Sequence, residues 1–202
     1  MGIFMIRAII DRRSIRKFKS DDIPKSVIEE IIKAGILAPS SKNRQPWKFI
    51  VTAGAEKERL LTAMEEGLER EKREPLLPDS ADYRKGAEYT LGIMRQAPVV
   101  IFIVNVLGQS LERTLMPEER IYEICNAQSI GAAVENMILA ATEAGLGSLW
   151  ICDTFFAQRE FNERLNTDGE LFAAMAVGYA DEMPLARPRK SMEDVVDWRF
   201  YE

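Results

Sequence analysis

The first quarter of the chain has two different patterns of apolar residues, one typical of helices and one typical of a strand. Residues 5–13, MIRAIIDRR, have helical apolar spacing and end in cations, which suit a helix C-terminus. Residues 24–36 begin at a proline and carry an apolar stripe of the same spacing, and Pro39 stops that pattern. Residues 48–54, KFIVTAG, are rich in β-branched side chains. The pattern therefore predicts two helices followed by a buried strand.

The middle of the chain predicts more helix and a central strand. Residues 55–73 are heavily charged and predict an exposed helix. Residues 98–106, PVVIFIVNV, form an almost continuous apolar run, which predicts a strand covered on both faces. Between them, residues 74–96 predict helical turns on either side of three interruptions. The interruptions are Pro75, Pro78 and Gly86.

The last third begins with a long segment rich in Ala and Met. Residues 119–147 predict a helix that is apolar nearly all round, therefore buried, and closed by glycines. Residues 148–151 and 172–180 predict further strands. The tail, residues 181–202, is too short to fold alone but keeps apolar side chains, so we expect it to pack on another surface. Helices alternating with strands of mixed length predict an α+β or α/β fold.

Length and composition indicate an ordinary globular protein. The chain has 202 residues, of which 47% are hydrophobic, and no apolar run approaches the roughly 20 residues needed to cross a bilayer. Residues 1–202 are expected to form a single domain, because no linker or repeat interrupts them. The N-terminal sequence lacks the features of a signal peptide or of myristoylation at Gly2. We therefore expect a cytoplasmic protein that does not bind a membrane.

Several classes of active site are excluded by residue counts. The chain has no histidine, which rules out histidine triads, histidine metal ligands and histidine proton relays. The two cysteines, Cys125 and Cys152, are far apart and form no CxxC pattern, so no metal site is expected. The chemistry of an enzyme built from this sequence must come from other groups.

Charge is concentrated at two places in an acidic chain. The net charge is −5, which argues against nucleic-acid binding, yet residues 12–19, RRSIRKFK, hold five cations. A second basic cluster, RPRK, occupies residues 187–190. Local cation clusters on an acidic protein favour a specific small anion as ligand.

Three segments carry candidate chemistry, and each also has a structural explanation. RRSIRKF offers guanidinium and hydroxyl donors suited to phosphate, or it is a solvated basic helix end. Residues 38–47, APSSKNRQPW, offer polar groups suited to a planar heteroaromatic ligand, or they form a turn after a helix. Residues 145–153, GLGSLWICD, permit a close backbone approach to a ligand, or their glycines only cap a helix. The absence of GxGxxG disfavours a Rossmann dinucleotide site.

Taken together and in order, four segments resemble the FMN-dependent nitroreductase family. They span most of the chain except roughly residues 55–96. The segments are RRSIRKF, APSSKNRQPWKFIV, NAQSIGAAVENMILAATEAGLGSLWI and AVGYADEMPLARPRKSMEDVV. The resemblance implies an α+β fold with a central mixed or antiparallel sheet flanked by helices. It also implies an intertwined homodimer with FMN at the subunit interface, in which residues 181–202 form an arm on the partner.

The resemblance implies a role for each matching residue. Arg16 would face the pyrimidine edge of the flavin near N1 and O2, where a fixed cation raises the reduction potential. No side chain would be catalytic in itself, since the flavin N5 carries the chemistry. Lys17 and Lys19 are expected to be solvated. The FMN phosphate and ribityl end would be held by Arg12, Ser14 and Arg189, with Arg187 at the phosphate, and Arg13 falls inside the same binding block. The other subunit would supply Pro39, Ser40, Ser41 and Asn43, and the backbone passing the flavin would be that of Ser148, Leu149, Trp150 and Ile151.

The resemblance also implies an activity. NADH or NADPH would deliver hydride to FMN, and a nitroaromatic, quinone or similar small-molecule acceptor would then remove the electrons in a ping-pong cycle. Two alternatives stay open on the sequence alone. One is another flavin reaction, such as reductive dehalogenation or flavin breakdown. The other is a non-catalytic flavin-binding sensor or store.

Overall fold

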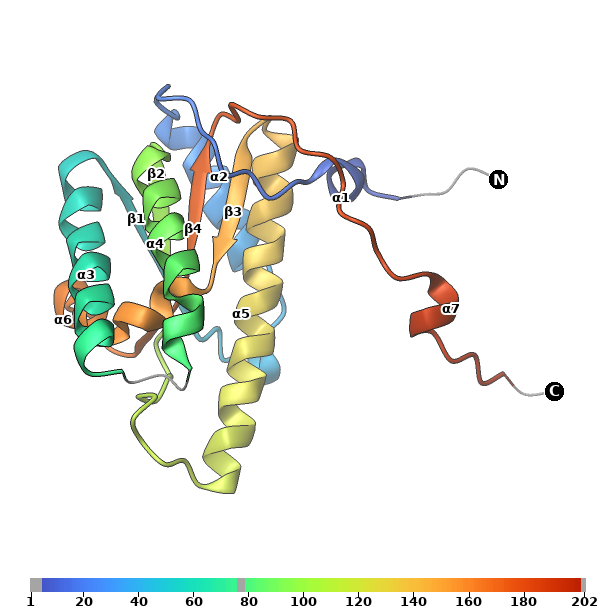
Figure 1. The fold of residues 1–202 in the computed structure, drawn as a ribbon. Coiled ribbons are helices and arrows are strands. Elements are labelled where there is room, and N and C mark those ends of the chain that lie inside the picture. The colour runs from blue at the N-terminus through green and yellow to red at the C-terminus, as the bar shows by residue number, and fades with distance from the viewer. Residues whose placement is uncertain (1–4, 76–78, 201–202) are drawn as a thin grey trace.

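A four-stranded sheet in the order β1-β2-β4-β3 forms the centre of the computed structural model, which describes residues 5–75 and 79–200 (Figure 1). Every neighbouring pair of strands is antiparallel, and the register slips once, between Ile103 and Val104. The predicted central sheet flanked by helices is confirmed. The strands are β1 (Trp47–Ala53), β2 (Val99–Asn105), β3 (Gly147–Ile151) and β4 (Glu170–Gly178).

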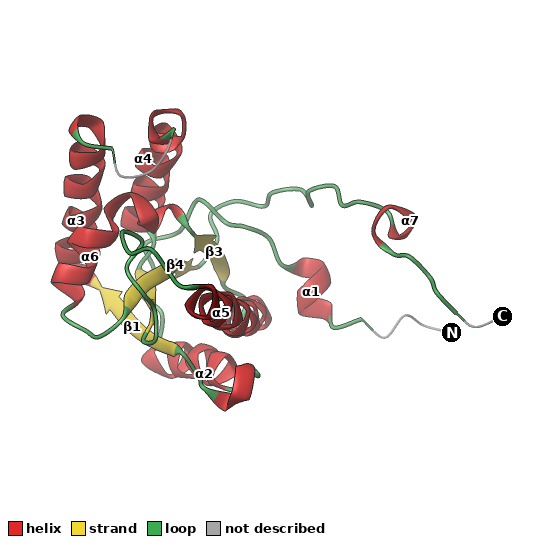
Figure 2. Cartoon of the chain, turned by 90° about the horizontal axis from the view of Figure 1, so that it is seen from below, coloured by secondary structure: helices red, strands yellow, loops and turns green. Residues whose placement is uncertain are grey.

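Helices cover both faces of this sheet (Figure 2). One face packs against α2 (Lys25–Ile36) and α5 (Pro117–Glu143), and the other packs against α3 (Gly54–Arg73), α4 (Ser80–Gln96) and α6 (Gln158–Leu165). All seven residues of β2 are buried as a result, which confirms the strand predicted from its continuous apolar run.

Alternate residues of β2 pack against the helices on opposite faces of the sheet. Phe102 points to the α3 side, where its ring lies 5.3 Å from that of Phe161 on α6. Ile101 and Ile103 point to the other side and pack with Ile130 of α5. The alternation follows from the period of two in an extended chain.

The sequence prediction differs from the structure in α1, α3 and α4. Helix α3 is not wholly exposed as expected, because Leu60, Leu61 and Met64 are buried. Helix α1 covers only Arg7–Asp11, so the cations predicted at its C-terminus follow it in non-helical backbone, beginning with Arg12 at φ −53° and ψ 130°. Helix α4 runs through Gly86 without interruption, because one glycine costs a helix only about 1 kcal/mol. Met1, Gly2 and Pro78 lie outside the described residues.

Two helical segments after β3 were not predicted. A 3-10 segment, η2 (Asp153–Ala157), leads into α6. Helix α6 has only two apolar side chains, Phe161 and Leu165, of which Phe161 is fully buried. Sequence analysis did not predict α6 because most of its residues are polar.

Helix α5 ends as predicted but is buried only in part. Gly145, at φ 75°, turns the chain, and the N–H of Leu146 donates to the carbonyl of Ala141 at 2.8 Å, which is a Schellman ending. The C-terminal half packs on the sheet. The other half leaves Ile121 and Ile124 59% and 52% exposed, so the expectation of a wholly buried helix is wrong for one protomer.

The C-terminal segment leaves the body of the protein (Figure 1). It contains a short helix, α7 (Met192–Val195), and beyond it the rings of Trp198 and Phe200 stack with centroids 5.4 Å apart. Leu185, Trp198 and Phe200 are all exposed, so within one protomer these apolar side chains are not packed against a core. Among the described residues, no helix is long and apolar enough to span a membrane.

Candidate functional site

Residues 12–19 form an extended segment held between β3 and the chain that follows β4. The N–H of Ile15 donates to the carbonyl of Ser148, and the N–H of Lys19 donates to that of Tyr179, both at 2.9 Å. Ser14 forms a parallel bridge with Ser148. A solvated helix end is therefore the wrong interpretation of this segment, because its backbone extends the sheet.

Gly147 makes this close approach possible. A Cβ at this position would lie 2.7 Å from Cγ1 of Ile15 and 3.0 Å from its Cβ. Ile15 is only 6% exposed, so it cannot turn outward without losing its buried contacts. Of the two glycines in GLG, Gly145 therefore ends the helix, whereas Gly147 gives room to the extended segment.

The two basic clusters of the sequence meet in one pocket of about 240 Å³. The extended segment forms one wall, and the chain after β4 forms the other. Six residues predicted to contact the phosphate or the flavin line this pocket. They are Arg12, Arg13, Ser14, Arg16, Arg187 and Arg189.

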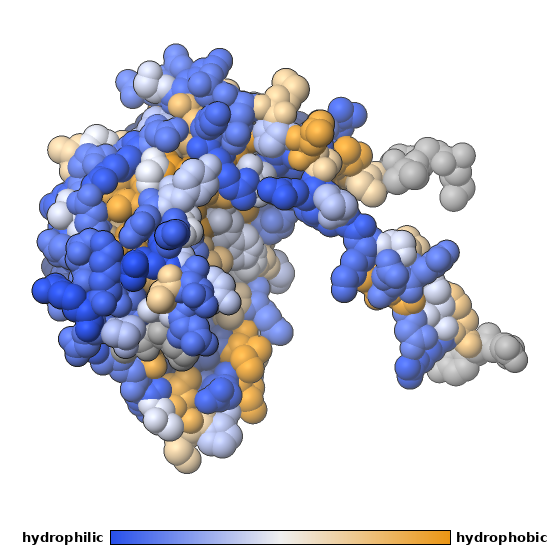
Figure 3. Space-filling view, in the orientation of Figure 1, coloured by the Kyte–Doolittle hydropathy of each residue, from blue (hydrophilic) through white to orange (hydrophobic). Residues whose placement is uncertain are grey.

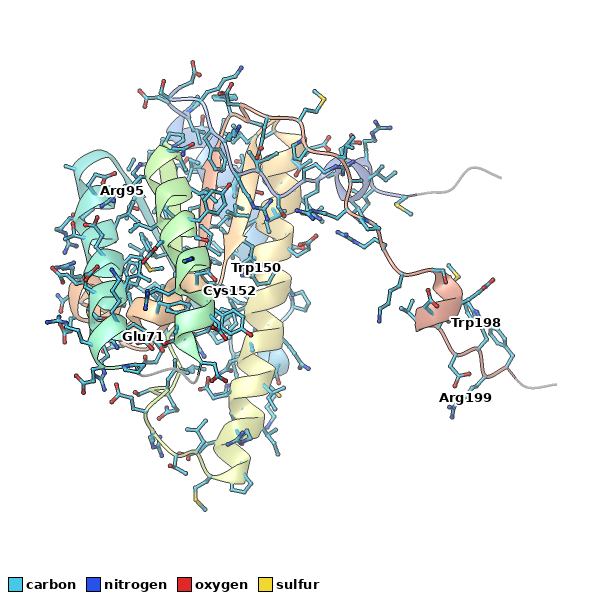
Figure 4. All side chains as sticks on the ribbon, in the orientation of Figure 1. Glu71, Arg95, Trp150, Cys152, Trp198 and Arg199 are labelled. Atoms are coloured by element: carbon cyan, nitrogen blue, oxygen red, sulfur yellow. The ribbon has the colours of Figure 1, made fainter. Side chains whose placement is uncertain are left out.

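The arginines of this pocket lack carboxylate partners within the described part of the chain. None of the five has a carboxylate oxygen within the 4.0 Å of a salt bridge, whereas Arg70 and Arg95 are paired. Arg95 lies 2.7 Å from Glu65, and Arg70 lies 2.7 Å from Glu160. Figure 4 shows Arg95 within the charged α3 and α4 layer, away from the pocket. Five arginines that line one pocket without a carboxylate partner favour an anion such as phosphate as ligand.

One acidic residue that sequence analysis missed fixes the pocket's geometry. Oε1 of Glu182 accepts hydrogen bonds from the backbone N–H groups of Arg16 and Lys17. This contact binds the start of the C-terminal segment to the N-terminal segment across 166 residues of sequence. No local pattern could have indicated it.

The loop before β1 is ordered by contacts with α5. It includes the 3-10 turn η1 (Ser41–Asn43), and the N–H of Ser41 donates to Oγ of Ser129 at 3.1 Å. Ser40 Oγ accepts from the N–H of Gln45 at 3.0 Å. Ser129 is a second residue that sequence analysis missed, because its neighbours read only as buried helix.

The four residues predicted in this loop do not line the arginine pocket of the same protomer. Pro39, Ser40, Ser41 and Asn43 are absent from the pocket's lining. The structure thus brings the arginines, Ser14 and the start of β3 together, and it leaves the loop elsewhere.

The predicted β3 backbone borders the extended segment. Ser148 and Leu149 are 3% and 8% exposed, whereas Trp150 is half-buried, and its ring lies beside Gly131 of α5. Among the described residues the indole Nε1–H has no hydrogen-bond partner, although it is buried.

Cys152 follows β3 and lies near Trp150 (Figure 4). Burial and the Asp153 carboxylate raise the pKa of its thiol. The thiol is therefore protonated at neutral pH and is a poor nucleophile.

Comparisons with known proteins show similar sequences and similar folds. The chain is 27% identical over 195 residues to YfhC of Bacillus subtilis (strain 168), provisionally named an NAD(P)H nitroreductase, covering 94% of this chain and 92% of that protein. A crystal structure of a provisionally assigned nitroreductase from Desulfovibrio desulfuricans, in complex with FMN, has a TM-score of 0.70 and is 26% identical, with 96% of each chain covered. A BluB-like flavoprotein from Clostridium difficile 630 has a TM-score of 0.76 and is 26% identical, with 96% of this chain and 97% of that chain covered.

The family assignment rests on most of the fold. The sequence model described as "Nitroreductase family" matches residues 9–179, a range that contains the whole sheet and the extended segment. The chain belongs to the nitroreductase family.

Proposed function

We propose that the protein is an FMN-dependent NAD(P)H oxidoreductase that reduces nitroaromatics, quinones or similar acceptors by a ping-pong cycle. The observation that carries the proposal is the pocket of five arginines and Ser14, because its donors suit a phosphate and its charge is not neutralised. The names of the relatives support the proposal, since one is an NAD(P)H nitroreductase and another binds FMN.

The residues present fit FMN. The phosphate end would contact Arg12, Ser14, Arg187 and Arg189, with Arg13 in the same wall. When bound, FMN supplies hydride transfer at its N5. Arg16 would hold positive charge at the pyrimidine edge of FMN, where negative charge accumulates on two-electron reduction, so that no proton donor would be needed there.

We further propose that the whole chain is one domain and that two chains complete each site. At about 240 Å³ the pocket of one protomer lies below the roughly 300–1,000 Å³ of typical ligand sites. The residues still required are Pro39, Ser40, Ser41 and Asn43, which a second subunit would supply, while the backbone of Ser148, Leu149, Trp150 and Ile151 passes the flavin.

Exposed apolar surface supports this homodimer. Figure 3 shows orange patches over α1 and over the lower end of α5. Ile9 and Ile10 are each 47% exposed in α1, and Ile121 and Ile124 contribute in α5. Monomeric proteins rarely expose such extensive apolar surface, and the arm, residues 181–202, would cover part of it on the partner.

A spectrum and a titration test the activity. The purified protein should show flavin absorbance bands that bleach with NADPH or NADH under anaerobic conditions, and that return when a quinone or nitroaromatic is added. Bands that persist with both nucleotides would contradict the oxidoreductase proposal. Failure to retain FMN after incubation would contradict the cofactor assignment.

Replacing Arg189 tests the phosphate site separately. Arg189→Ala should raise the dissociation constant of FMN about 10- to 100-fold, because a charged hydrogen bond contributes about 1.5–3 kcal/mol. Arg73→Ala removes an exposed arginine outside the pocket and serves as the control. Equal FMN affinity in Arg189→Ala and the wild type, measured by fluorescence titration, would show that Arg189 does not hold the phosphate.

A second candidate function is another flavin reaction, since a BluB-like flavoprotein matches as well as the nitroreductases do. Reductive dehalogenation and flavin breakdown belong to this class. Chromatography of the products formed with halogenated phenols, or with reduced FMN and oxygen, distinguishes it from the first. A flavin sensor or store would reduce acceptors no faster than free FMN does.

A further inference from the structure

Two cations outside the arginine pocket surround one aromatic ring. The Nζ of Lys42 lies 5.9 Å from the centroid of the Tyr122 ring, and the guanidinium carbon of Arg44 lies 4.8 Å from it. The hydroxyl of Tyr122 donates to Oε1 of Glu118 at 3.0 Å, which fixes the ring on α5. Two positive charges therefore lie close to the Tyr122 ring, near the N-terminal end of α5.

These charges are not neutralised by a close carboxylate. Within residues 5–75 and 79–200, neither Lys42 nor Arg44 has a carboxylate oxygen within the 4.0 Å of a salt bridge. Burial raises the pKa of the Glu123 carboxyl, and the charge of Arg44 partly offsets this increase. Arg44 and Glu123 nevertheless form no ion pair. Neighbouring residues at this end of α5 are paired, as Arg113 is with Glu119. The two cations therefore remain available to an external anion.

The loop that carries Lys42 and Arg44 has an unusual backbone conformation at Lys42 and at both neighbours of Arg44. Lys42, Asn43 and Gln45 have φ values of 52°, 53° and 46°, which are uncommon for residues other than glycine. Such conformations cost of order 1–3 kcal/mol each and occur preferentially at ligand sites. Here the hydrogen bonds of Ser41 to Ser129 and of Gln45 to Ser40 maintain them.

We propose that Lys42 and Arg44 form a subsite for the phosphate groups of the nicotinamide dinucleotide. The inference rests on the proposed function, in which Ser41 and Asn43, the neighbours of Lys42, face the flavin of the partner subunit. A dinucleotide that reacts at that flavin brings its own phosphates, and the arginine pocket is committed to the phosphate of FMN. A guanidinium and an ammonium that lie 4.8 Å and 5.9 Å from one ring centroid suit phosphate groups, because arginine binds phosphate oxygens in bidentate fashion.

A series of hydride donors tests the subsite in the FMN-loaded full-length protein. NADPH carries a pyrophosphate and a 2′-phosphate, NADH carries only the pyrophosphate, and 1-benzyl-1,4-dihydronicotinamide carries no phosphate. Lys42→Gln and Arg44→Gln should each lower the ratio of kcat/KM for a dinucleotide to that for the benzyl compound by about 10- to 100-fold. A lower ratio for NADPH alone identifies the 2′-phosphate, and lower ratios for both dinucleotides identify the pyrophosphate.

The matched control is Lys25→Gln, which removes the same charge from the exposed start of α2. Its ratios should equal those of the wild type within about twofold. Unchanged ratios in Lys42→Gln and Arg44→Gln would overturn the proposal. A parallel loss with all three donors would also overturn it, because it would indicate a disturbed flavin or fold and no phosphate contact.

Binding without turnover separates this inference from the proposed function. Titration of the oxidised holoenzyme with NADP⁺, followed by calorimetry, should give a dissociation constant about 100-fold higher or more in the double variant and less dependent on salt. If no donor reduces the wild-type flavin, the proposed function fails, while the NADP⁺ titration still tests the subsite. Equal NADP⁺ affinity in the wild type and the double variant overturns the subsite.

Discussion

Replacing Gly147 by alanine should disturb both stability and cofactor retention through a single new methyl group. The Cβ of alanine would meet Cγ1 of Ile15 at 2.7 Å and its Cγ2 at 3.0 Å. The glycine does not adopt a positive φ, so backbone conformation adds no cost. Relief of the contact requires the extended segment to move away from β3, and Ser14 and Arg16 move with it.

The magnitude follows from packing. Inserting a methyl group into a well-packed region costs about 1–3 kcal/mol, and Ile15 is buried with little freedom to adjust. We expect urea unfolding, at one protein concentration and with FMN in excess, to show a loss of this size. The dissociation constant of FMN, measured by fluorescence, should rise as well, because Ser14 and Arg16 line the pocket.

Two variants show whether the contact itself is responsible. Gly92→Ala, in α4, meets nothing within 4 Å and should stabilise the protein by up to about 1 kcal/mol through helix propensity. Adding Ile15→Ala to Gly147→Ala should cost less than the sum of the two single changes. Wild-type stability and FMN affinity in Gly147→Ala, or strict additivity in the double variant, would refute the reasoning.

Two further predictions concern buried charge. Arg70→Met should lower the free energy of unfolding by about 3–5 kcal/mol, because it removes a guanidinium that contacts Glu71 and Glu160 at 2.8 and 2.7 Å in a largely buried setting. Arg59→Met, which breaks an exposed pair, should cost at most about 1 kcal/mol in the same urea titration, and equal losses would contradict the reasoning. Burial raises the pKa of the Glu123 carboxyl above its ordinary 4.5, so the folded state holds that proton more tightly and stability falls as pH rises through the window above 4.5. Glu123→Gln should flatten that part of the pH–stability curve, and a curve of unchanged slope would show that another group titrates there.

The elements that sequence could predict are those with one dominant local cause. Strand β2 is a continuous apolar run, and burial on both faces is the one environment that suits it. The end of α5 depends on a glycine at positive φ, which is also a local requirement. The pocket arginines were predicted because their motifs are short and specific in combination, and the structure places them together.

What sequence could not predict depends on contacts between distant segments. The end of α1 was misplaced because Arg12 and Arg13 suit a helix end, but the extended segment gains a place beside β3 instead. The roles of Glu182 and Ser129 depend on partners 166 and 88 residues away, respectively, so neither has a local signature. Helix α4 was obscured by Gly86, since tertiary packing outweighs the small helix penalty of one exposed glycine.

The strand order has a consequence for the nascent chain. Strand β2 can pair with β1, which precedes it, but its other edge waits for β4, which is complete only at Gly178, 73 residues later. At about 5–20 residues per second, that edge stays open for roughly 4–15 s of synthesis. During this interval VVIFIVN, an uncharged segment of high β-propensity, has an unpaired edge and is prone to aggregation, so slow synthesis should favour aggregation where chaperones are scarce.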